Sequence, residues 1–349
     1  MKITKKVNVG GVTLGGGAPV AIQSMTTTKT SDVEKTVAQI QALQKAGCEI
    51  VRVAVSDETD ALAIKQVVSQ IALPLVADIH FSPKLAVMAI ENGADKVRIN
   101  PGNIGGEREI AYVADCVKAH GIPVRVGANT GSVEKNFLQK YGKNEFSLVE
   151  SALYNVGILE KFGVQDIVIS VKASSVPLTV KAYTLLAKKT DYPLHLGVTE
   201  AGTTQAGIVK SAVGIGSLLL NGIGDTIRVS LTDDPVKEIQ AAKLILRSCG
   251  LDEEYVEVVS CPTCGRCSWD SMGLADRVTE FVRPYKKKCK LAVMGCVVNG
   301  PGEAKDADLG IAGGDNSCLI FKKGQPYKKV AASVAEEEFF KEVKLLLDE

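Results

Sequence analysis

The chain has 349 residues, of which 46% are hydrophobic and 23% charged, as in a globular protein with one large domain or two smaller ones. Lys and Arg number 41 and Asp and Glu 40, which argues against the strong basic field of nucleic-acid-binding and membrane-surface proteins. No run approaches ~18 apolar residues and the basic N-terminus lacks a signal-peptide core, so we expect a cytoplasmic protein without a membrane span.

Short apolar segments alternate with amphipathic helical segments from residue 20 to residue 250. In helical segments such as 32–47 and 82–93, apolar residues recur at i, i+3, i+4 and i+7, and several segments end in Gly. The sequence predicts eight strands, at 19–25, 49–55, 73–80, 95–100, 123–129, 166–174, 194–200 and 225–231. Eight strand–helix units over ~230 residues predict an α/β protein with a (β/α)8 TIM barrel; an open doubly wound sheet is the alternative.

Polar residues occupy the C-terminal ends of these strands, where a barrel interior usually holds Val, Ile or Leu. Five are cations, and the whole set is Arg52, Asp78, His80, Arg98, Asn100, Arg125, Asn129, Lys172, His195, Glu200, Arg228 and Ser230. Buried cations are costly without a partner, and guanidinium groups suit phosphate oxygens, so the pattern predicts a site for a phosphate or diphosphate ester. Glu200 is either an acid/base or a counter-charge. The opposing interpretation is that each residue is structural or faces the helices.

The barrel is expected to span 1–250, and residues 251–349 are expected to form a smaller α+β domain that holds most of the nine cysteines. CPTCGRC at 261–267 places Cys261 and Cys264 close enough to share a metal, and Cys296 follows in MGCVVNGPGEA. This domain contains no His and no second, separate Cys pair, which favours iron–sulfur over zinc. Redox or core cysteines are the third possibility.

Long segments of the chain resemble the 4-hydroxy-3-methylbut-2-enyl diphosphate synthase family in its short bacterial form. They are PVAIQSMTTTKTSD, VADIHF, VRINPGNIG, RVGANTGS, SVKAS, HLGVTEAG, IRVSLTDDP, CPTCGR and MGCVVNGPGEAKDADLGIAGG. The resemblance implies a TIM barrel that binds the substrate diphosphate, followed by an iron–sulfur domain with one [4Fe–4S] cluster per subunit. The implied ligands are Cys261, Cys264, Cys296 and Glu303. Cys267 falls where family members generally lack a cysteine, so by resemblance it is not a ligand.

The resemblance also implies a reaction in isoprenoid precursor biosynthesis. 2-C-methyl-D-erythritol 2,4-cyclodiphosphate is opened and loses oxygen as water, giving (E)-4-hydroxy-3-methylbut-2-enyl diphosphate. Reduced flavodoxin or ferredoxin supplies two electrons through the cluster. Glu200 would donate a proton or orient the substrate, and Glu303 would act as an exchangeable iron ligand. The implied substrate contacts are Arg52, Arg98, Arg125, Asn129, Lys172, His195, Arg228 and Ser230.

The substrate and the cluster must meet, but the linker after the last barrel helix is short. The resemblance implies a homodimer in which the cluster domain of one chain covers the barrel of the other. Two other functions stay open from the residues alone. One is a barrel aldolase or isomerase with a zinc-stabilised tail, in which Lys172 forms a Schiff base. The other is a non-enzymatic redox or iron-sensing module.

Overall fold

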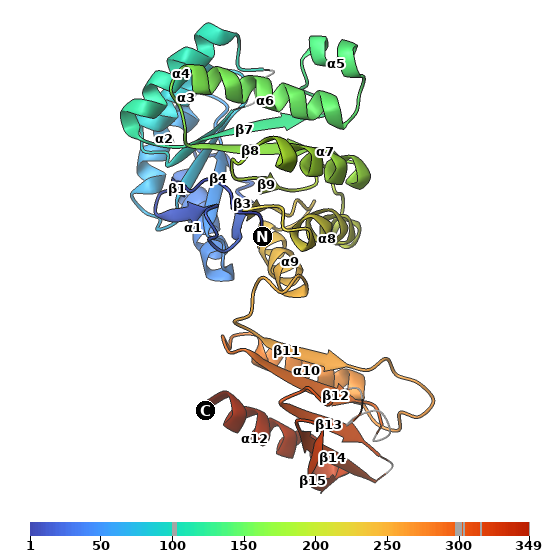
Figure 1. Ribbon diagram of the computed structural model, residues 1–349. Coiled ribbons are helices and arrows are strands. Elements are labelled where there is room, and N and C mark those ends of the chain that lie inside the picture. The colour runs from blue at the N-terminus through green and yellow to red at the C-terminus, as the bar shows by residue number, and fades with distance from the viewer. Residues whose placement is uncertain (100–102, 297–301, 303, 315, 349) are drawn as a thin grey trace. The chain divides into compact units, whose positions relative to one another are not determined.

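The computed structural model describes residues 1–99, 103–296, 302, 304–314 and 316–348. The chain divides into two compact units, Met1–Leu251 and Asp252–Glu349 (Figure 1). Among the described helices, none combines the length and apolar character needed to cross a lipid bilayer. Asn100 and Glu303, two residues singled out from the sequence, lie outside the described residues.

The first unit is built on eight parallel strands in the order β8-β7-β6-β5-β4-β3-β10-β9. A parallel bridge between Ile169 and Leu194 joins β8 to β9 at the two ends of this order, so the sheet closes on itself. The predicted (β/α)8 barrel is therefore confirmed over the open-sheet alternative. The strands are β3 (Ala21–Met25), β4 (Ile50–Ala54), β5 (Leu75–Ile79), β6 (Lys96–Ile99), β7 (Val124–Asn129), β8 (Ile167–Lys172), β9 (His195–Leu196) and β10 (Thr226–Ile227).

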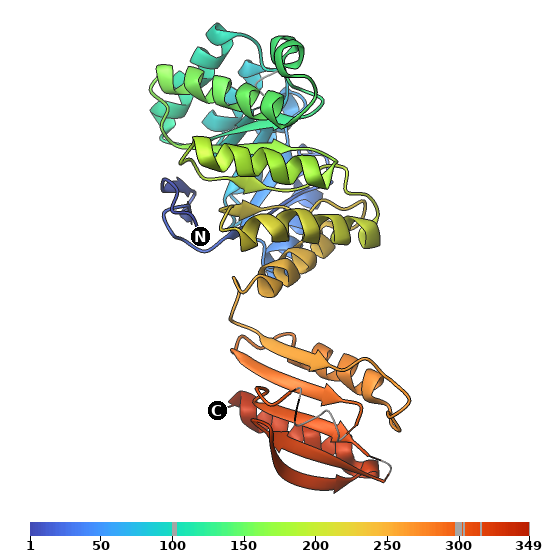
Figure 2. The same ribbon diagram turned by 45° about the vertical axis from the view of Figure 1, so that its right-hand side comes forward.

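Helices follow the strands and lie outside the barrel, where those of its second half run side by side (Figure 2). Several begin at a side chain that accepts a hydrogen bond from the first helical turn, namely Asp32, Asp57, Ser82, Asn144, Ser175 and Asp234. The helices are α1 (Val33–Ala46), α2 (Glu58–Val68), α3 (Pro83–Glu91), α4 (Glu107–His120), α5 (Lys135–Tyr141), α6 (Glu145–Lys161), α7 (Val176–Lys189), α8 (Thr204–Leu220) and α9 (Pro235–Ser248).

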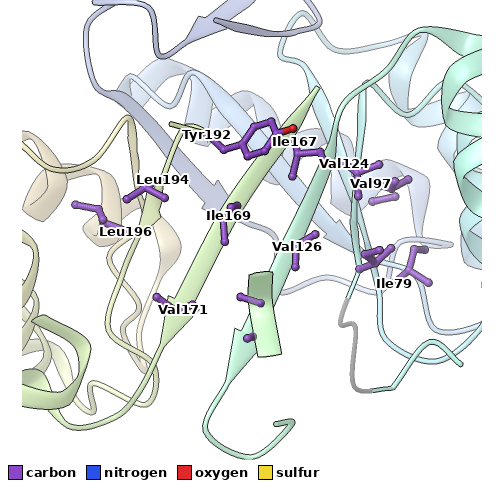
Figure 3. Close-up of a cluster of buried hydrophobic side chains, with 14 of the residues drawn as sticks. Ile79, Val97, Val124, Val126, Ile167, Ile169, Val171, Tyr192, Leu194 and Leu196 are labelled. Atoms are coloured by element: carbon purple, nitrogen blue, oxygen red, sulfur yellow. The ribbon is translucent and has the colours of Figure 1, made fainter. Parts of the chain in front are cut away.

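Side chains alternate between the two faces of each barrel strand. In β8, Ile167, Ile169 and Val171 belong to the large apolar core together with residues of the neighbouring strands (Figure 3). Val168 belongs instead to a separate cluster inside the barrel. Because side chains repeat their direction every second residue, Lys172 shares the inward face with Val168.

An N-terminal hairpin that the sequence reading overlooked closes one end of the barrel. Strands β1 (Val7–Val9) and β2 (Val12–Leu14) pair antiparallel around a Gly–Gly turn. Their buried side chains pack with the first inward residues of four strands, forming the cluster Val7, Val9, Leu14, Ala21, Ile50, Val76 and Val168. The hairpin therefore fills the barrel at the N-terminal end of its strands. We expect the binding site at the C-terminal end.

Strands β9 and β10 are shorter than predicted, at two residues each against 194–200 and 225–231. Gly197, directly after β9, explains the early end. A Cβ at this position would come within 2.6 Å of Lys172 Nζ and 2.8 Å of the Arg228 carbonyl oxygen. The Lys172 side chain and the Arg228 backbone thus take the space beside this segment, and the regular strand stops there.

The second unit is a five-stranded mixed sheet in the order β11-β12-β13-β14-β15, confirming the expected α+β type. β11 (Val256–Ser260), β12 (Cys289–Met294) and β13 (Leu309–Gly313) are parallel, and β14 (Ser317–Lys322) and β15 (Gln325–Ala331) are antiparallel. Helices α10 (Ser271–Val282) and α12 (Ala335–Asp348) bury Val278 and Phe339 in one apolar cluster with the sheet, so both cover the same face.

Replacing Leu14 with Ala tests the plug formed by the hairpin. The fully buried side chain leaves a cavity, and we expect the free energy of unfolding of the barrel to fall by about 2–5 kcal/mol. Urea denaturation followed by circular dichroism measures the change. Leu62→Ala, on the exposed face of α2, is the control and should change stability by less than about 0.5 kcal/mol. Equal effects of the two changes would contradict the plug.

Candidate active site

The barrel interior gathers the strand-borne cations predicted from the sequence. Asp78, Arg98 and Arg125 lie in register across three neighbouring strands, β5, β6 and β7. Arg52 on β4 and Lys172 on β8 extend this group, and both are buried. Arg228, directly after β10, is partly buried. The electrostatic interactions among these residues show that one end of the barrel collects them all.

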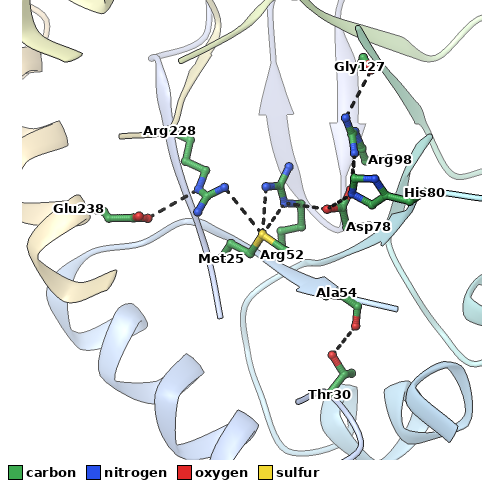
Figure 4. Close-up of polar contacts among 10 residues, drawn as sticks. All are labelled: Met25, Thr30, Arg52, Ala54, Asp78, His80, Arg98, Gly127, Arg228 and Glu238. Carbon is green, nitrogen blue, oxygen red and sulfur yellow. Dashed lines mark hydrogen bonds and ion pairs between the residues drawn. The ribbon is translucent and has the colours of Figure 1, made fainter. Parts of the chain in front are cut away.

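Asp78 is the central counter-charge of this group (Figure 4). Its carboxylate accepts from Arg98 Nη1 at 3.1 Å, contacts His80 Nε2 at 3.3 Å, and lies 3.8 Å from Arg52 Nε. Burial alone would raise the pKa of Asp78, but Arg52, His80 and Arg98 outweigh it and hold that pKa well below its usual range. Asp78 therefore stays ionised at neutral pH.

A thioether accepts from two of the guanidinium groups. Arg52 Nε and Nη2 lie 3.1 and 3.0 Å from Met25 Sδ, and Arg228 Nη1 lies 3.7 Å from the same sulfur (Figure 4). Thioether sulfur is a weak acceptor and carries no charge. Glu238 on α9 lies 3.6 Å from Arg228 Nε, but it also accepts from Ser24 Oγ. Both guanidinium groups thus keep donor capacity for a stronger, anionic acceptor.

Positive charge exceeds negative charge inside the barrel. Arg125 is fully buried, and its Nε and Nη1 have no hydrogen-bond partner among the described residues. Burial, and then Arg52 and Arg98, lower the pKa of Arg125 well below its usual range. Burial, and then Arg125 and Arg52, also lower the pKa of Lys172 well below its usual range. An anion of two or more charges placed here would satisfy the donors and reverse these shifts.

Gly127 leaves room for a cation beside the strands. A Cβ on Gly127 would come within 2.7 Å of Arg98 Nε and 3.2 Å of Ser170 Oγ. Gly197, described above, does the same for Lys172. Absent side chains at these two inward positions allow Arg98 and Lys172 to extend across the barrel, so the glycines are part of the site.

The polar interior extends deeper than the sequence reading expected. His195, a predicted substrate contact, has no exposed surface, and neither ring nitrogen has a partner among the described residues. Burial, and then Arg125 and Lys172, lower the pKa of His195 well below its usual range, so its ring is neutral. Lys96 and Gln23 are equally buried polar residues that went unnoticed. The sequence contained a signal for both residues. Lys96 stands two residues before Arg98 and Gln23 stands two residues before Met25, so each shares the inward face of its strand.

The rim of the barrel holds the remaining predicted residues. Asn129 and Ser230 are partly exposed at the ends of their segments. Glu200 is exposed and has φ of +54°, a left-handed conformation that non-glycine residues rarely adopt. Such strain often marks a functional position. Asp78 and Glu238 form ion pairs with the strand-borne cations, and the role of Glu200 as an acid/base or a counter-charge stays a prediction.

Two cysteines of the second unit, Cys261 and Cys296, lie at one edge of its sheet. Cys261 directly follows β11 and Cys296 follows β12, and these parallel strands pair up to Ser260 and Val293. The carboxyl ends of parallel strands share an edge, so both thiols belong to it. Cys264 is exposed in the loop after Cys261. Contacts with Arg266 lower the pKa of the Cys264 thiol.

Gly295 shapes the space between two of the sulfurs. Its backbone N–H donates to Cys261 Sγ at 3.0 Å. A Cβ on Gly295 would come within 3.1 Å of Cys267 Sγ and 3.3 Å of Cys261 Sγ. Thiol ligands and an amide hydrogen bond to sulfur are features of iron–sulfur sites, and Gly295 leaves space beside the sulfurs. The chemistry of these residues therefore suits an iron–sulfur cluster. Among the described residues, however, no three ligating side chains converge into a complete metal site.

Two domain families match the chain: the GcpE TIM-barrel domain over residues 4–243 and the GcpE protein C-terminal domain over residues 257–345. The chain belongs to the GcpE family. A 4-hydroxy-3-methylbut-2-en-1-yl diphosphate synthase (flavodoxin) from Caldanaerobacter subterraneus subsp. tengcongensis is 56% identical over 349 residues, which cover 100% of this chain and 98% of the relative. Proteins of the same name from Desulfotalea psychrophila and Clostridium perfringens are 53% and 55% identical, covering 99% and 97% of this chain and 96% and 98% of the relatives.

Solved structures outside the GcpE family share the barrel. A Yersinia pestis dihydropteroate synthase matches with a TM-score of 0.52 at 11% identity, over 70% of this chain and 98% of that one. A truncated 3-deoxy-D-arabino-heptulosonate 7-phosphate synthase from Thermotoga maritima matches with a TM-score of 0.53 at 15% identity, over 71% of this chain and 94% of that one. At these identities the likeness concerns the fold alone.

Asp78→Asn should destabilise the barrel strongly, because it leaves Arg98 and Arg52 buried without their carboxylate. We expect the free energy of unfolding at pH 7 to fall by about 3–5 kcal/mol in urea denaturation. Asp32→Asn, at an exposed carboxylate paired with Lys35, is the control and should leave stability nearly unchanged.

The pH dependence supplies a second measurement of the same change. The pKa of Asp78 is depressed by folding, so its contribution is complete above the unfolded value of about 3.9 and is lost as pH falls toward the folded value. The stability difference between the wild-type chain and Asp78→Asn should therefore shrink below about pH 3.9. A difference that stays constant down to unfolding would contradict an ionised Asp78.

Proposed function

We propose that the protein is a 4-hydroxy-3-methylbut-2-enyl diphosphate synthase of isoprenoid precursor biosynthesis. It converts 2-C-methyl-D-erythritol 2,4-cyclodiphosphate to (E)-4-hydroxy-3-methylbut-2-enyl diphosphate by reductive ring opening and loss of water. The observation that carries this proposal is the excess of buried cations in a barrel whose full-length relatives, one of them 56% identical, have this name. A cyclic diphosphate supplies the multiple negative charge that the interior needs.

The barrel's own residues bind and orient this substrate. Arg52 and Arg228 would exchange the weak thioether acceptor Met25 for diphosphate oxygens. The unpartnered donors of Arg125 and the ammonium of Lys172 would contact the same group from the neighbouring strands. Asp78 keeps Arg98 aligned. Asn129, Ser230 and the neutral ring of His195 add uncharged hydrogen bonds.

Glu200 is proposed as the proton donor or orienting group. Its left-handed backbone fixes a carboxyl at the rim, outside the ion-pair network of Asp78. Loss of a hydroxyl as water consumes a proton at the departing oxygen, and an exposed carboxyl at the mouth can receive protons from solvent.

The second domain is proposed to carry one [4Fe–4S] cluster per subunit, held by Cys261, Cys264, Cys296 and Glu303. When bound, the cluster supplies single electrons and a Lewis-acidic iron. Cys261 fits because its sulfur already accepts an amide hydrogen bond, as ligand sulfurs of such clusters do. Glu303 offers a harder and more exchangeable ligand than a thiolate.

Protein purified without oxygen should be brown and contain about four irons per chain and no zinc. Cys264→Ser should remove most of the iron, because it takes away one of the proposed ligands. The fold should stay intact, because Cys264 is exposed. Cys116→Ser is the control. Cys116 lies on barrel helix α4, outside the second domain, so this variant should keep its iron. Metal analysis by mass spectrometry measures both.

The same preparation separates the competing functions. With reduced flavodoxin and the cyclic diphosphate, the brown protein should turn over. Colourless protein with one zinc would instead favour an aldolase-like barrel with Lys172 as a Schiff base. Iron without turnover would favour a non-enzymatic iron sensor.

Reduced flavodoxin is the proposed electron donor, as the names of the relatives indicate, with ferredoxin as the other candidate. The cytoplasm is the proposed location, because thiols stay reduced there. A homodimer is proposed in which the cluster domain of one chain serves the barrel of its partner. This arrangement would bring the electron source to a substrate that lies deep among the strand-borne cations.

Mixing two inactive variants tests the shared site. Arg125→Met disables the barrel and Cys264→Ser disables the cluster, so neither homodimer should turn over. After subunit exchange, activity should recover to about a quarter of the wild-type value, because half of the dimers are mixed and each has one intact site. Absence of recovery, with mixed dimers verified by native mass spectrometry, would contradict the arrangement.

A further inference from the structure

Cys267 has a defined place that the proposed cluster does not use. Its sulfur and that of Cys261 flank one point, lying 3.1 and 3.3 Å from where a Cβ of Gly295 would stand. Cys267 N–H also donates to the Cys264 carbonyl oxygen at 2.9 Å, which folds the loop back toward Cys261. The two sulfurs therefore border the same point, and no side chain of residue 295 occupies it.

The two neighbouring sulfurs make different hydrogen bonds. Cys261 Sγ accepts from the Gly295 N–H at 3.0 Å. Cys267 Sγ–H donates to the Trp269 carbonyl oxygen at 3.2 Å, and Ser271 Oγ lies 3.3 Å away. Trp269 Nε1 donates in turn to the Gly295 carbonyl oxygen at 3.2 Å. Cys261 is thus bonded to Gly295 directly, whereas Cys267 is bonded to the backbone of Trp269, whose ring in turn bonds to Gly295.

Cys264 is a poorer neighbour for Cys261, although the spacing of the two suggests a pair. Cys264 is exposed and contacts Arg266, whereas Cys261 and Cys267 are both partly buried beside Gly295. Partial burial and the shared position beside Gly295 therefore favour Cys267 as the partner of Cys261.

We propose that Cys261 and Cys267 form a disulfide when the iron-free protein meets a peroxide. Hydrogen peroxide oxidises one thiol to a sulfenic acid and releases one water. The second thiol attacks that sulfur, forms the S–S bond and releases another water. In total two thiols lose two electrons and two protons, and one peroxide is reduced to two waters.

This disulfide is a modification site with a consequence for metal loading. A sulfur in a disulfide cannot ligate iron, so oxidation would remove Cys261 from the set of cluster ligands. A reducing thiol such as dithiothreitol would cleave the disulfide and make Cys261 available again. This consequence rests on the proposed function, whereas formation of the bond does not. Cys267 would then protect Cys261 from irreversible oxidation beyond the sulfenic acid.

Peptide mapping tests the bond directly. Iron-free full-length protein is treated with one equivalent of hydrogen peroxide, blocked with iodoacetamide and digested with trypsin. Cleavage after Arg266 separates Cys261 and Cys264 from Cys267, so the proposed bond joins two peptides. We expect that crosslink, with fragment ions that assign Cys261, and its loss after dithiothreitol. A Cys261–Cys264 bond within one peptide, a crosslink to Cys264 or Cys296, or no loss of thiols would overturn the proposal.

Matched serine variants complete the test. Cys267→Ser should lose the crosslink and show more Cys261 sulfinic acid after peroxide, and Cys264→Ser should keep the crosslink. Iron uptake by wild-type protein should stop after peroxide and return after dithiothreitol, whereas Cys267→Ser should not recover. A crosslink without any effect on iron uptake would sink the cluster assignment and leave the disulfide standing. The same crosslink yield in Cys267→Ser would sink the disulfide.

Discussion

Unbalanced positive charge inside a closed barrel is the constraint on which the rest of this structure depends. Asp78 anchors Arg98 and approaches Arg52, but Arg125 keeps buried donors without partners among the described residues. Burying an unpaired cation is expensive, so the fold must recover that energy elsewhere. It does so with an apolar layer around the strands and a hairpin that fills the opposite end.

Small residues make this interior possible. Gly127 and Gly197 leave space for Arg98 and Lys172, and Met25 offers two guanidinium groups a soft acceptor that an anion can replace. These features have a common result: the cations are held in place before any ligand arrives. Prearranged donors of this kind favour a multiply charged ligand over a neutral one, because the cost of gathering them has already been met by folding.

In the second domain, backbone groups rather than charged side chains position the reactive cysteines. Gly295 donates to Cys261, receives from Trp269 through its carbonyl oxygen, and leaves the space that separates Cys261 from Cys267. One residue without a side chain thereby borders both thiols. In our proposals, Cys261 either ligates the cluster or, in the iron-free protein, forms a disulfide with Cys267.

The sequence alone determined the barrel, because eight alternating strand and helix patterns are local signals, and it determined which cations line the interior, because side chains repeat every second residue. It missed the hairpin at Val7–Leu14, Lys96 and the short β9, whose causes lie in contacts between distant segments. Only the tertiary structure decided that Asp78 and Glu238 form ion pairs with the cations, and that Cys261 and Cys267 both border Gly295. Spacing along a chain specifies the direction of a side chain, whereas its neighbours depend on how separate segments pack.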